Sequence, residues 1–369
     1  MNAMQQVQVR VGLPLPGGRL VRAARDRGYP VLFSANAFAR TYPKGHEREG
    51  FFERFRLPDA DQLAGIDAAL DSAGYVAAAR YGDYRWSVDE YIGLVGSHPW
   101  RWWASMDMCC ESEVACDRPT RLLRMAATAY LLGRCRAAAA ERGLPAPNPV
   151  LQGWTPDDYA RCASWLPLTE WPTLVGIGSV CRRQVRGPDG ILAVLDALED
   201  VLPSHTSVHL FGVKSTALAQ LAQHPRVASV DSMAWDLQAR AERRTGRDMA
   251  FRIGHMEAWA EKQRRIVDRE RRGVGATSRR TLMSPQIHGP LSSREDLALE
   301  ALALQYADLV ISGDVDYRDA VFHAARDGVT LIAILRRDGY RDESFARLND
   351  ELVAGLGDRL EEMLEGGGA

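Results

Sequence analysis

Short apolar runs alternate with helical patterns along the first 240 residues of the chain. The runs are rich in β-branched and aromatic residues, which favour strands, and the segments between them repeat apolar residues at helical spacing. Eight strands are predicted, at Val7–Leu13, Pro30–Ala35, Gly65–Asp71, Trp102–Asp107, Pro149–Gly153, Thr173–Gly178, Ser207–Gly212 and Val227–Asp231. Helical patterns between them include Ser87–Gly96, Arg118–Arg142, Pro156–Ser164, Pro188–Val201 and Ser215–Gln223.

This alternation predicts an α/β fold with a parallel sheet. Eight strand–helix units in about 235 residues match the size of a TIM (β/α)8 barrel, which is the fold that we expect. A doubly wound open sheet is the alternative, because periodicity does not show whether a sheet closes. After residue 240 the pattern changes to a basic helix, Met256–Arg272, and a basic glycine-containing loop. We therefore expect a barrel domain at 1–240, a basic helix and linker at 241–290, and a small C-terminal α/β unit at 291–369.

Polar residues follow several of the predicted strands. Thr155 with Pro156 and Ser87 with Glu90 are N-cap signals, and they indicate where the loops before two helices end. Five polar residues then fall at or just after the carboxyl ends of strands: Asp71, Asp107, Gln152, Ser179 and Asp231. In a barrel this end carries the chemistry.

The three aspartates among them have two interpretations. A buried unpaired carboxylate is unfavourable, so an apolar run that ends in Asp indicates a function for the acid. Alternatively, each Asp is simply the N-cap of the next helix. The glycines near Gly153 and Gly176–Gly178 lack the spacing of a dinucleotide-binding motif, and they are better suited to close approach of the backbone to a flat ligand.

Composition and charge exclude several classes of protein. With 46% hydrophobic and 25% charged residues, the 369-residue chain is neither collagen-like nor disordered nor a coiled coil. Its net charge of −2 excludes a uniformly basic nucleic-acid binder, but residues 240–284 hold thirteen Lys or Arg against six Asp or Glu. No run of about 18 apolar residues predicts a membrane span, and the polar N-terminus does not resemble a signal peptide. We expect a cytoplasmic protein.

The six cysteines do not predict a metal site. They are Cys109, Cys110, Cys116, Cys135, Cys162 and Cys181. No histidine lies near the first three, and their spacing is not that of a zinc site. In the cytoplasm they would stay reduced.

Four motifs together resemble the tRNA-guanine transglycosylase superfamily, and more closely its DNA-directed, DpdA-like branch of deazapurine DNA-modification transglycosylases. They are LQGWTPDDY at Leu151–Tyr159, VGIGSVCRR at Val175–Arg183, HLFGVKSTAL at His209–Leu218 and VDSMAW at Val230–Trp235. The resemblance covers roughly residues 5 to 240, and the order and spacing of the motifs make it specific. It implies a TIM barrel that exchanges guanine in a polynucleotide for a 7-deazaguanine base.

The resemblance also implies roles for individual residues. Asp231 matches the nucleophilic aspartate of the family, and Asp71 matches its general acid/base. The residues that match the base-binding positions are Asp107, Ser72, Tyr75, Gln152, Gly153, Gly176, Gly178, Ser179 and Phe211. Asp107 would read the donor edge of guanine, and Tyr75 and Phe211 would stack on its two faces, although either ring could instead be plain core packing.

Chemical reasoning from the residues agrees with these roles. Exchange at a glycosidic bond with retention suits a carboxylate nucleophile and a second acid/base group. A guanine inside a duplex is out of reach, so the DNA would be single-stranded or the base flipped out.

Two departures from the family pattern concern the substrate polymer. Family members usually carry a zinc site of three cysteines and a histidine after the nucleophile, but this chain has no cysteine after Cys181 and no cofactor is predicted. Ala73 replaces a motif glycine. The basic segment could take over nucleic-acid binding through Arg264, Arg265, Arg271, Arg272, Arg279 and Arg280. The alternative is a solvated helix face.

The C-terminal unit predicts helix Ser293–Gln305, strand Asp308–Ser312, helix Tyr317–Asp327, strand Thr330–Leu335 and a tail helix Asp342–Glu365. Residues 307–321 resemble part of the PIN-like (NYN) nucleases, in which acids bind a divalent metal, and Asp314, Asp316 and Asp319 would match those acids. A preceding strand with the first catalytic aspartate is missing, which favours a structural appendage.

The leading hypothesis is a transglycosylase that exchanges guanine in DNA for a 7-deazaguanine through a covalent aspartyl–sugar intermediate. The second is an enzyme that exchanges or hydrolyses bases of free nucleosides. The third is a non-catalytic nucleic-acid-binding protein. The partners expected under the first are DNA and a 7-deazaguanine base; accessory proteins and a homodimer stay open.

Overall fold

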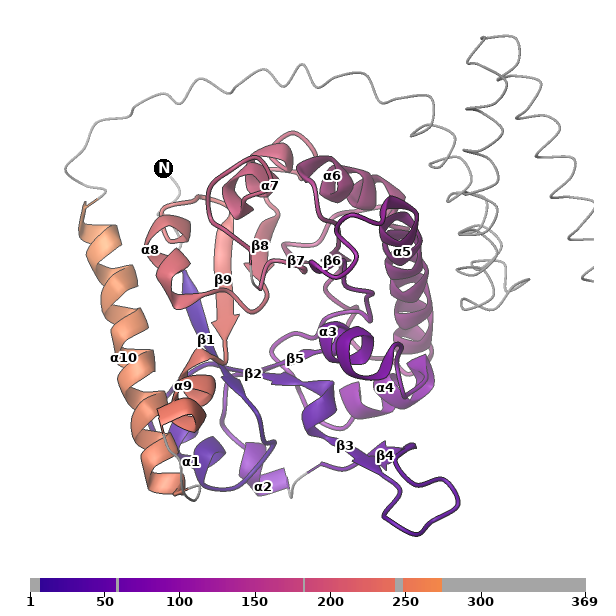
Figure 1. Ribbon diagram of the computed structural model, residues 1–369, viewed down its shortest axis with the longest axis vertical. Helices are drawn as coiled ribbons and strands as arrows, with labels where there is room; N and C mark the ends of the chain where they lie inside the picture. The colour runs from indigo at the N-terminus through magenta and orange to yellow at the C-terminus, as the bar shows by residue number, and fades with distance from the viewer. Residues whose placement is uncertain (1–6, 58–59, 182, 243–247, 274–369) are drawn as a thin grey trace, which may run out of the picture.

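A curled parallel sheet organises the chain (Figure 1). The computed structural model describes residues 7–57, 60–181, 183–242 and 248–273. Seven strands pair in the order β5-β2-β1-β9-β8-β7-β6, every neighbouring pair being parallel. They are β1 (Gln8–Leu13), β2 (Val31–Ser34), β5 (Ala68–Asp71), β6 (Val150–Leu151), β7 (Leu174–Ile177), β8 (Ser207–Leu210) and β9 (Val227–Ser232). The predicted α/β class with a parallel sheet is confirmed.

Helices cover the outer side of the sheet (Figure 1). The longer ones are α1 (Arg19–Asp26), α4 (Val88–Val95), α5 (Arg118–Glu141), α6 (Pro156–Trp165), α7 (Ile191–Ala197), α9 (Ala234–Glu242) and α10 (Met249–Gly273). Short turns of helix are η1 (Ala35–Ala37), α2 (Ala60–Leu63), α3 (Gly74–Val76), the π-helical η2 (Ala77–Tyr81), η3 (Ser215–Ala217) and α8 (Leu218–Leu221). The predicted caps are confirmed: Ser87 and Thr155 each form a capping box, with Glu90 and Asp158.

The predicted strand Trp102–Asp107 is wrong as a strand, because this segment forms only two isolated parallel bridges among the described residues. Leu70 pairs with Trp103 on one side, and Ala104 pairs with Asn148 on the other. Beyond Ser105 the backbone N–H groups bond to side chains instead of a neighbouring strand. Those of Asp107 and Met108 donate to the hydroxyls of Tyr84 and Thr128. The ladder therefore stops after one bridge on each side.

The core lies between the sheet and the helices. Val11 and Leu13 of β1 belong to one buried cluster with Leu20 of α1 and Trp259 of α10. A second cluster joins β7 and β8 to α6 and α7. Burying a Val, Leu or Phe side chain stabilises a fold by roughly 1.5–3 kcal/mol, so these two clusters hold the helices against the strands. The polar residues at the strand ends lie outside both clusters.

A β-hairpin between β2 and β5 was not predicted. Its strands β3 (Ala39–Thr41) and β4 (Phe52–Phe55) are antiparallel and separate from the main sheet. The connecting loop, residues 42–51, is mostly exposed and polar. The two strands have only three and four residues, which is too short for a clear alternation of apolar and polar residues.

The predicted basic helix is present as α10, and it begins seven residues earlier than expected, at Met249. Its buried residues Met256, Trp259, Ala260 and Val267 lie at helical spacing. They pack α10 against α1, α8, α9 and β1. The elements predicted in the C-terminal unit, with Asp314, Asp316 and Asp319, lie outside the described residues. No helix in the described ranges is both long and apolar enough to cross a membrane.

Candidate functional site

The carboxyl ends of the parallel strands bring the five predicted polar residues to one edge of the sheet. Asp71 ends β5, Gln152 follows β6 and Ser179 follows β7. Asp231 is the second-last residue of β9. Asp107 follows the segment that bridges β5 and Asn148. The sequence-based placement at strand ends is therefore confirmed for four of these side chains, and Asp107 follows the bridging segment instead of a strand. The structure adds the contacts between them.

Asp107 lies at the centre of this cluster and is buried. One carboxylate oxygen accepts a hydrogen bond from Ser72 Oγ at 2.7 Å, and the other accepts from Gln152 Nε2. The Tyr84 hydroxyl donates to the Asp107 carbonyl at 2.9 Å. Burial raises the pKa of Asp107 to about 6, whereas the Ser72 and Gln152 hydrogen bonds oppose that rise. At neutral pH the group is therefore mostly a carboxylate.

Gly74 lets the loop after β5 pass directly over Asp107. A Cβ at this position would lie 2.6 Å from the Asp107 carbonyl oxygen and 2.9 Å from both carboxylate oxygens. No side chain fits there without displacing the carboxylate. The glycine therefore sets the distance between the β5 loop and the acid.

Gln152 connects Asp107 to the loop after β7. Its Oε1 accepts from Ser179 Oγ at 2.6 Å, and Ser179 Oγ in turn accepts from the Cys110 N–H at 2.7 Å. Ser179 has the unusual φ of 54°. A Cβ at Gly178 would lie 2.1 Å from Gln152 Nε2. Gly178 therefore leaves the space in which the amide reaches Asp107.

Asp71 has a different environment from Asp107. Its Oδ2 accepts from the Ala73 N–H at 3.1 Å. The side chain keeps some exposed surface, yet it lies deep among protein atoms. Burial raises the pKa of Asp71 to about 8, and the negative charges of Asp107 and Asp231 add to the rise. At neutral pH this carboxyl group is therefore mostly protonated.

Ala73 occupies the position at which the resemblance implies glycine. Its φ is 74°, in the left-handed region that glycine adopts readily and that costs other residues roughly 1–2 kcal/mol. In this conformation the Ala73 N–H points to Asp71. Ala73 therefore introduces local backbone strain at the turn that contacts Asp71.

Asp231 is held from two sides. Its Oδ1 accepts from the Gly212 N–H at 2.8 Å, and His209 Nε2 lies 3.3 Å from the same oxygen. His209 Nδ1 contacts Ser229 Oγ at 2.8 Å. Burial lowers the pKa of His209, against the effect of Asp231. Burial therefore disfavours the cationic form of His209, and the 3.3 Å approach of its Nε2 to Asp231 is a close contact rather than a hydrogen bond.

A layer of large side chains lies below Asp231. Arg10 of β1 is the register partner of Asp231, and its Nη1 donates to Asp67 Oδ1 at 3.0 Å. Its guanidinium lies 5.4 Å from the ring centroid of Trp102. The His209 ring packs edge-on against Trp102 at 4.9 Å between centroids. These contacts fill the interior between the strands beneath the aspartates.

Phe211 follows β8 and Tyr75 lies on α3, each close in sequence to a residue of the cluster. The Phe211 ring packs over Gly176, where a Cβ would lie 2.5 Å from Phe211 Cε2. It also packs edge-on against His209 at 4.6 Å. Tyr75 lies on α3, next to the Gly74 that covers Asp107. Both rings are half-buried, so part of each remains available to a ligand.

Gly153 shapes the loop after β6. A Cβ there would lie 2.6 Å from the Asp158 Cβ. The Asp158 carboxylate accepts from the Trp154 and Thr155 N–H groups at 2.9 and 3.0 Å and from Arg121 Nε at 3.0 Å. Gly153 therefore allows the first turn of α6 to approach β6 closely, which fixes Gln152 beside it.

The predicted nucleic-acid-binding arginines are not brought to this edge where they are described. Arg264 packs over the Tyr29 ring at 4.6 Å and donates to the Gly28 carbonyl, in the turn that precedes β2. It thus lies near the amino end of β2, the opposite end from the aspartates. Arg265 Nε donates to the Glu261 carbonyl. Arg271 and Arg272 belong to α10, whereas Arg279 and Arg280 lie outside the described residues.

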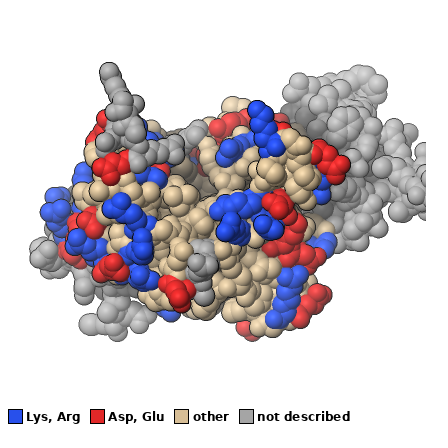
Figure 2. Space-filling view, turned by 90° about the horizontal axis from the view of Figure 1, so that it is seen from below, with Lys and Arg blue, Asp and Glu red and all other residues tan. Residues whose placement is uncertain are grey.

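The surface charge agrees with this placement. On the face seen in Figure 2, Lys and Arg side chains are interspersed with Asp and Glu among the described residues, and they do not form one continuous basic field. Glu257 and Glu261 of α10 pair with Arg27 and Arg264. The basic residues of this helix therefore carry acidic neighbours.

The described residues do not supply the zinc site that the resemblance implies. A structural zinc site needs thiolate or imidazole ligands grouped around one point. The described residues contain no group of three or more His, Cys, Asp or Glu arranged for a metal. His255, which follows Asp231 in the sequence, pairs instead with Glu242 at 3.1 Å.

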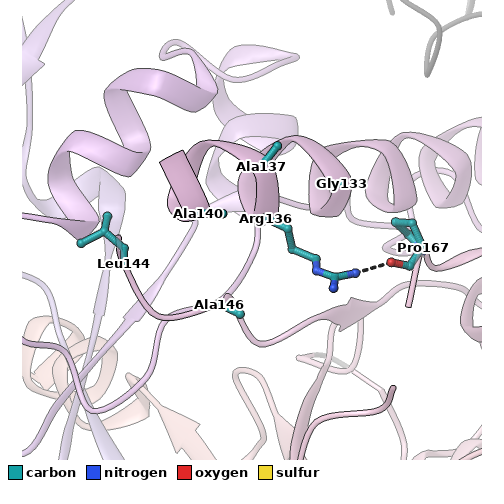
Figure 3. Close-up of a pocket in the computed structure, with 7 residues that line it drawn as sticks. All are labelled: Gly133, Arg136, Ala137, Ala140, Leu144, Ala146 and Pro167. Carbon is teal, nitrogen blue, oxygen red and sulfur yellow. Dashed lines mark hydrogen bonds between the residues drawn. The ribbon is translucent and has the colours of Figure 1, made fainter. Parts of the chain in front are cut away.

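A groove of about 490 Å³ lies away from the aspartates, on α5 (Figure 3). Gly133, Ala137 and Ala140 line it, and the Arg136 guanidinium donates to the Pro167 carbonyl across it. Its walls are mainly small apolar side chains, which offer few groups that could recognise a ligand.

Three residues of the site were not singled out from the sequence. His209 lies on β8, and Phe211 comes two positions later, directly after the strand. At this spacing both side chains point to the same face of the sheet, which is a usable signal. Arg10 occupies an inward position of β1, but a lone Arg in a strand does not reveal its partner. Tyr84 lies in a loop, and no local pattern connects it with Asp107.

The protein is an α/β protein with a curled parallel sheet. Its polar side chains gather at the carboxyl ends of the strands, which is where barrel-like α/β enzymes have their active sites. The family model of DpdA, DeoxyPurine in DNA protein A, matches residues 50–276, which is more than half of the chain. The protein therefore belongs to the DpdA family. No curated protein matches the chain.

Proposed function

We propose that the protein is a transglycosylase that exchanges guanine in DNA for a 7-deazaguanine base, such as 7-cyano-7-deazaguanine. The observation that carries this proposal is the set of three neighbouring aspartates with three different environments. Asp71 has a raised pKa, Asp107 is fixed by Ser72 and Gln152, and Asp231 accepts from the Gly212 N–H beside the His209 ring. Carboxyl groups whose environments separate their pKa values are suited to separate roles. The name of the DpdA family, which refers to a deoxypurine in DNA, supports DNA as the substrate.

Asp231 is the proposed nucleophile. Its free carboxylate oxygen attacks C1′ of the deoxyribose, the C1′–N9 bond breaks, and the bonding electrons leave with guanine. The proton of Asp71 neutralises the departing base, so Asp71 ends this half-reaction as a carboxylate. The incoming 7-deazaguanine gives its N9 proton to Asp71 and attacks C1′, which releases Asp231. Two inversions give net retention.

Asp107 is the proposed reader of the base. Guanine presents two donors on one edge, the N1–H and the exocyclic amine, and a carboxylate accepts from both. The hydrogen bonds from Ser72 and Gln152 hold both oxygens in place before the base arrives. Because a 7-deazaguanine has the same donor edge, this contact would serve both the leaving and the incoming base.

Phe211 and Tyr75 are the proposed stacking partners of the base. Each is half-buried, Phe211 just after β8 and Tyr75 on α3 beside Gly74. A base held this way must leave its helical stack, so the DNA is single-stranded or the nucleotide is flipped out.

We also propose that the sheet is a (β/α)8 barrel whose remaining strand is the bridging segment. Arg101 N–H donates to the Ala68 carbonyl at 2.7 Å, and Asn148 N–H donates to the Trp103 carbonyl at 2.8 Å. The segment thus bonds to β5 on one side and to the residues just before β6 on the other. With it, eight parallel segments would follow one another around the axis.

The exchange itself is the first test. We expect a single-stranded oligonucleotide with one guanine, incubated with the protein and 7-cyano-7-deazaguanine, to gain the mass of one base replacement by mass spectrometry. Parallel reactions with a tRNA and with guanosine identify the substrate class. Exchange with guanosine and none with DNA would instead support the free-nucleoside enzyme. DNA binding without exchange or a covalent adduct would support the non-catalytic alternative.

A second prediction concerns Gly178. Gly178→Ala places a methyl group against Gln152 Nε2 and displaces the amide from Asp107. We expect the affinity for free guanine, measured by isothermal titration calorimetry, to fall at least about tenfold, since a hydrogen bond to a charged group contributes about 1.5–3 kcal/mol. Gly254→Ala is the control, because a Cβ at Gly254 of α10 meets nothing within 4 Å. Equal affinities of the two variants would contradict the role of Gln152.

A further inference from the structure

The β3–β4 hairpin has an exposed face on which aromatic rings and guanidinium groups alternate. It follows the carboxyl end of β2, whose last residue Ser34 is the register partner of Asp71. Figure 1 shows its loop projecting beyond the ring of helices. The hairpin therefore stands on the side of the molecule where the site lies.

Two arginines and the aromatic rings that they contact make up this face. Arg48 lies 5.0 Å from the ring centroid of Tyr42, which is itself stacked on His46 at 4.3 Å. Arg85 lies 5.7 Å from the ring of Phe51 and 4.6 Å from that of Tyr81. We call Tyr42, Arg48, Phe51 and Arg85 the hairpin face. Phe51 is 56% exposed, which is unusual for a ring of its size.

The hairpin face is held in place by backbone contacts. Arg85 Nη1 donates to the Gly50 carbonyl at 3.0 Å. The Tyr42 N–H donates to the Phe51 carbonyl at 3.0 Å, and the Gly50 N–H donates to the Tyr42 carbonyl at 3.2 Å. The rings are therefore presented on a supported loop. A supported ring loses less conformational entropy on binding than a ring on a free loop does.

The opposite side of the hairpin connects to the base site through packed rings. Phe52 and Phe55 of β4 pack against Trp86 at 5.8 and 5.1 Å, and Trp86 packs against Tyr84 at 5.6 Å. The Tyr84 hydroxyl contacts both the Asp107 carbonyl and Ser72 Oγ at 2.9 Å. Two ring contacts thus separate the hairpin from the residues that hold Asp107.

We propose that the hairpin face binds the single-stranded DNA that flanks the exchanged nucleotide. This inference rests on the proposed function, because it takes DNA as the substrate. Every base has a flat face that stacks on an aromatic ring, and the exposed Phe51 supplies such a ring. A guanidinium carries five N–H donors, so Arg48 and Arg85 can keep their present contacts and still donate to phosphate oxygens.

The charge of the hairpin favours DNA held by stacking. Residues 39–56 contain five Lys or Arg and three Asp or Glu, a small basic surplus. The binding that follows is sequence-tolerant and only moderately dependent on salt, because it releases few counterions. This surface also differs from the basic residues of α10, since Arg264 lies near the amino end of β2.

The test measures the affinity of the full chain for a fluorescein-labelled single-stranded oligonucleotide with one guanine by fluorescence anisotropy. We expect Phe51→Ala to weaken binding about tenfold, the usual scale for the loss of one stacked base. The double variant Arg48→Ala, Arg85→Ala should weaken oligonucleotide binding further. Arg134→Ala is the matched control, since Arg134 also lies over an aromatic ring, that of Tyr130 on α5. Its affinity should stay within twofold of the parent.

A second readout separates this inference from the proposed function. Free guanine should bind the hairpin variants and the parent equally well by calorimetry. Hairpin variants that bind DNA as tightly as the Arg134→Ala variant would overturn the inference, and so would an equal loss of free-guanine affinity, which would indicate damage to the base site. If the variants lose DNA binding selectively while the parent exchanges no base, the inference stands and the proposed exchange fails.

Discussion

Asp231→Asn is expected to lower the rate of guanine exchange by at least about 10⁴-fold, because an amide cannot replace a nucleophilic carboxylate. The change is nearly isosteric, and the amide oxygen can still accept from the Gly212 N–H that holds Asp231 at 2.8 Å. Folding and DNA affinity should therefore be preserved. The measurement is single-turnover exchange of a guanine-containing oligonucleotide followed by mass spectrometry.

The covalent intermediate gives a second measurement of the same variant. The parent protein should form an adduct with DNA that survives denaturing electrophoresis, and Asp231→Asn should not. Asp61→Asn, on the short helix α2, is the control and should keep both exchange and adduct. An adduct of normal yield in Asp231→Asn would contradict the assignment and move the nucleophile to Asp71 or Asp107.

The pH dependence of exchange is expected to be bell-shaped, with limbs near pH 6 and pH 8. Burial and the charges of Asp107 and Asp231 raise the pKa of Asp71 to about 8, so its proton is present below that pH and lost above it. Since the departing guanine takes this proton, exchange should fall about tenfold per unit above pH 8. Asp107, with a pKa of about 6, must be ionised to accept from guanine, so exchange should also fall below pH 6.

Variants assign the two limbs. Asp71→Asn should lower exchange about 10²- to 10⁴-fold and remove the upper limb. Asp107→Asn removes one of the negative charges that raise the pKa of Asp71, so any residual exchange should show its upper limb at lower pH. Because the carboxyl groups interact, the limbs are properties of the cluster. An upper limb that persists unchanged in Asp71→Asn would show that another group supplies the proton.

Local patterns predicted most of the fold. Seven of the eight apolar runs form strands, within a few residues of the expected bounds, because parallel strands covered by helices are rich in apolar residues whatever their neighbours are. The caps at Ser87 and Thr155 were also local signals. The bridging segment after Trp102 was not predictable in this way, because its later N–H groups bond to Tyr84 and Thr128, which no pattern in that segment encodes.

The candidate site shows a similar division. The sequence could place Asp71, Asp107 and Asp231 at strand ends, since each closes an apolar run. It could not show that Gln152 reaches Asp107, that His209 approaches Asp231, or that Gly74 lies over the Asp107 carboxylate. These contacts join residues from separate loops.

The sequence by itself determined the order of strands and helices, the motifs that resemble the DNA-directed transglycosylases, and the residue types at each strand end. These are properties of short segments, set by periodicity and side-chain chemistry. Only the tertiary structure decided the raised pKa of Asp71, the placement of Arg264 near the amino end of β2, and the support of Asp107 by Tyr84. Those depend on burial and on distances between residues far apart in the chain, which the curling of the sheet and the packing of the helices bring together.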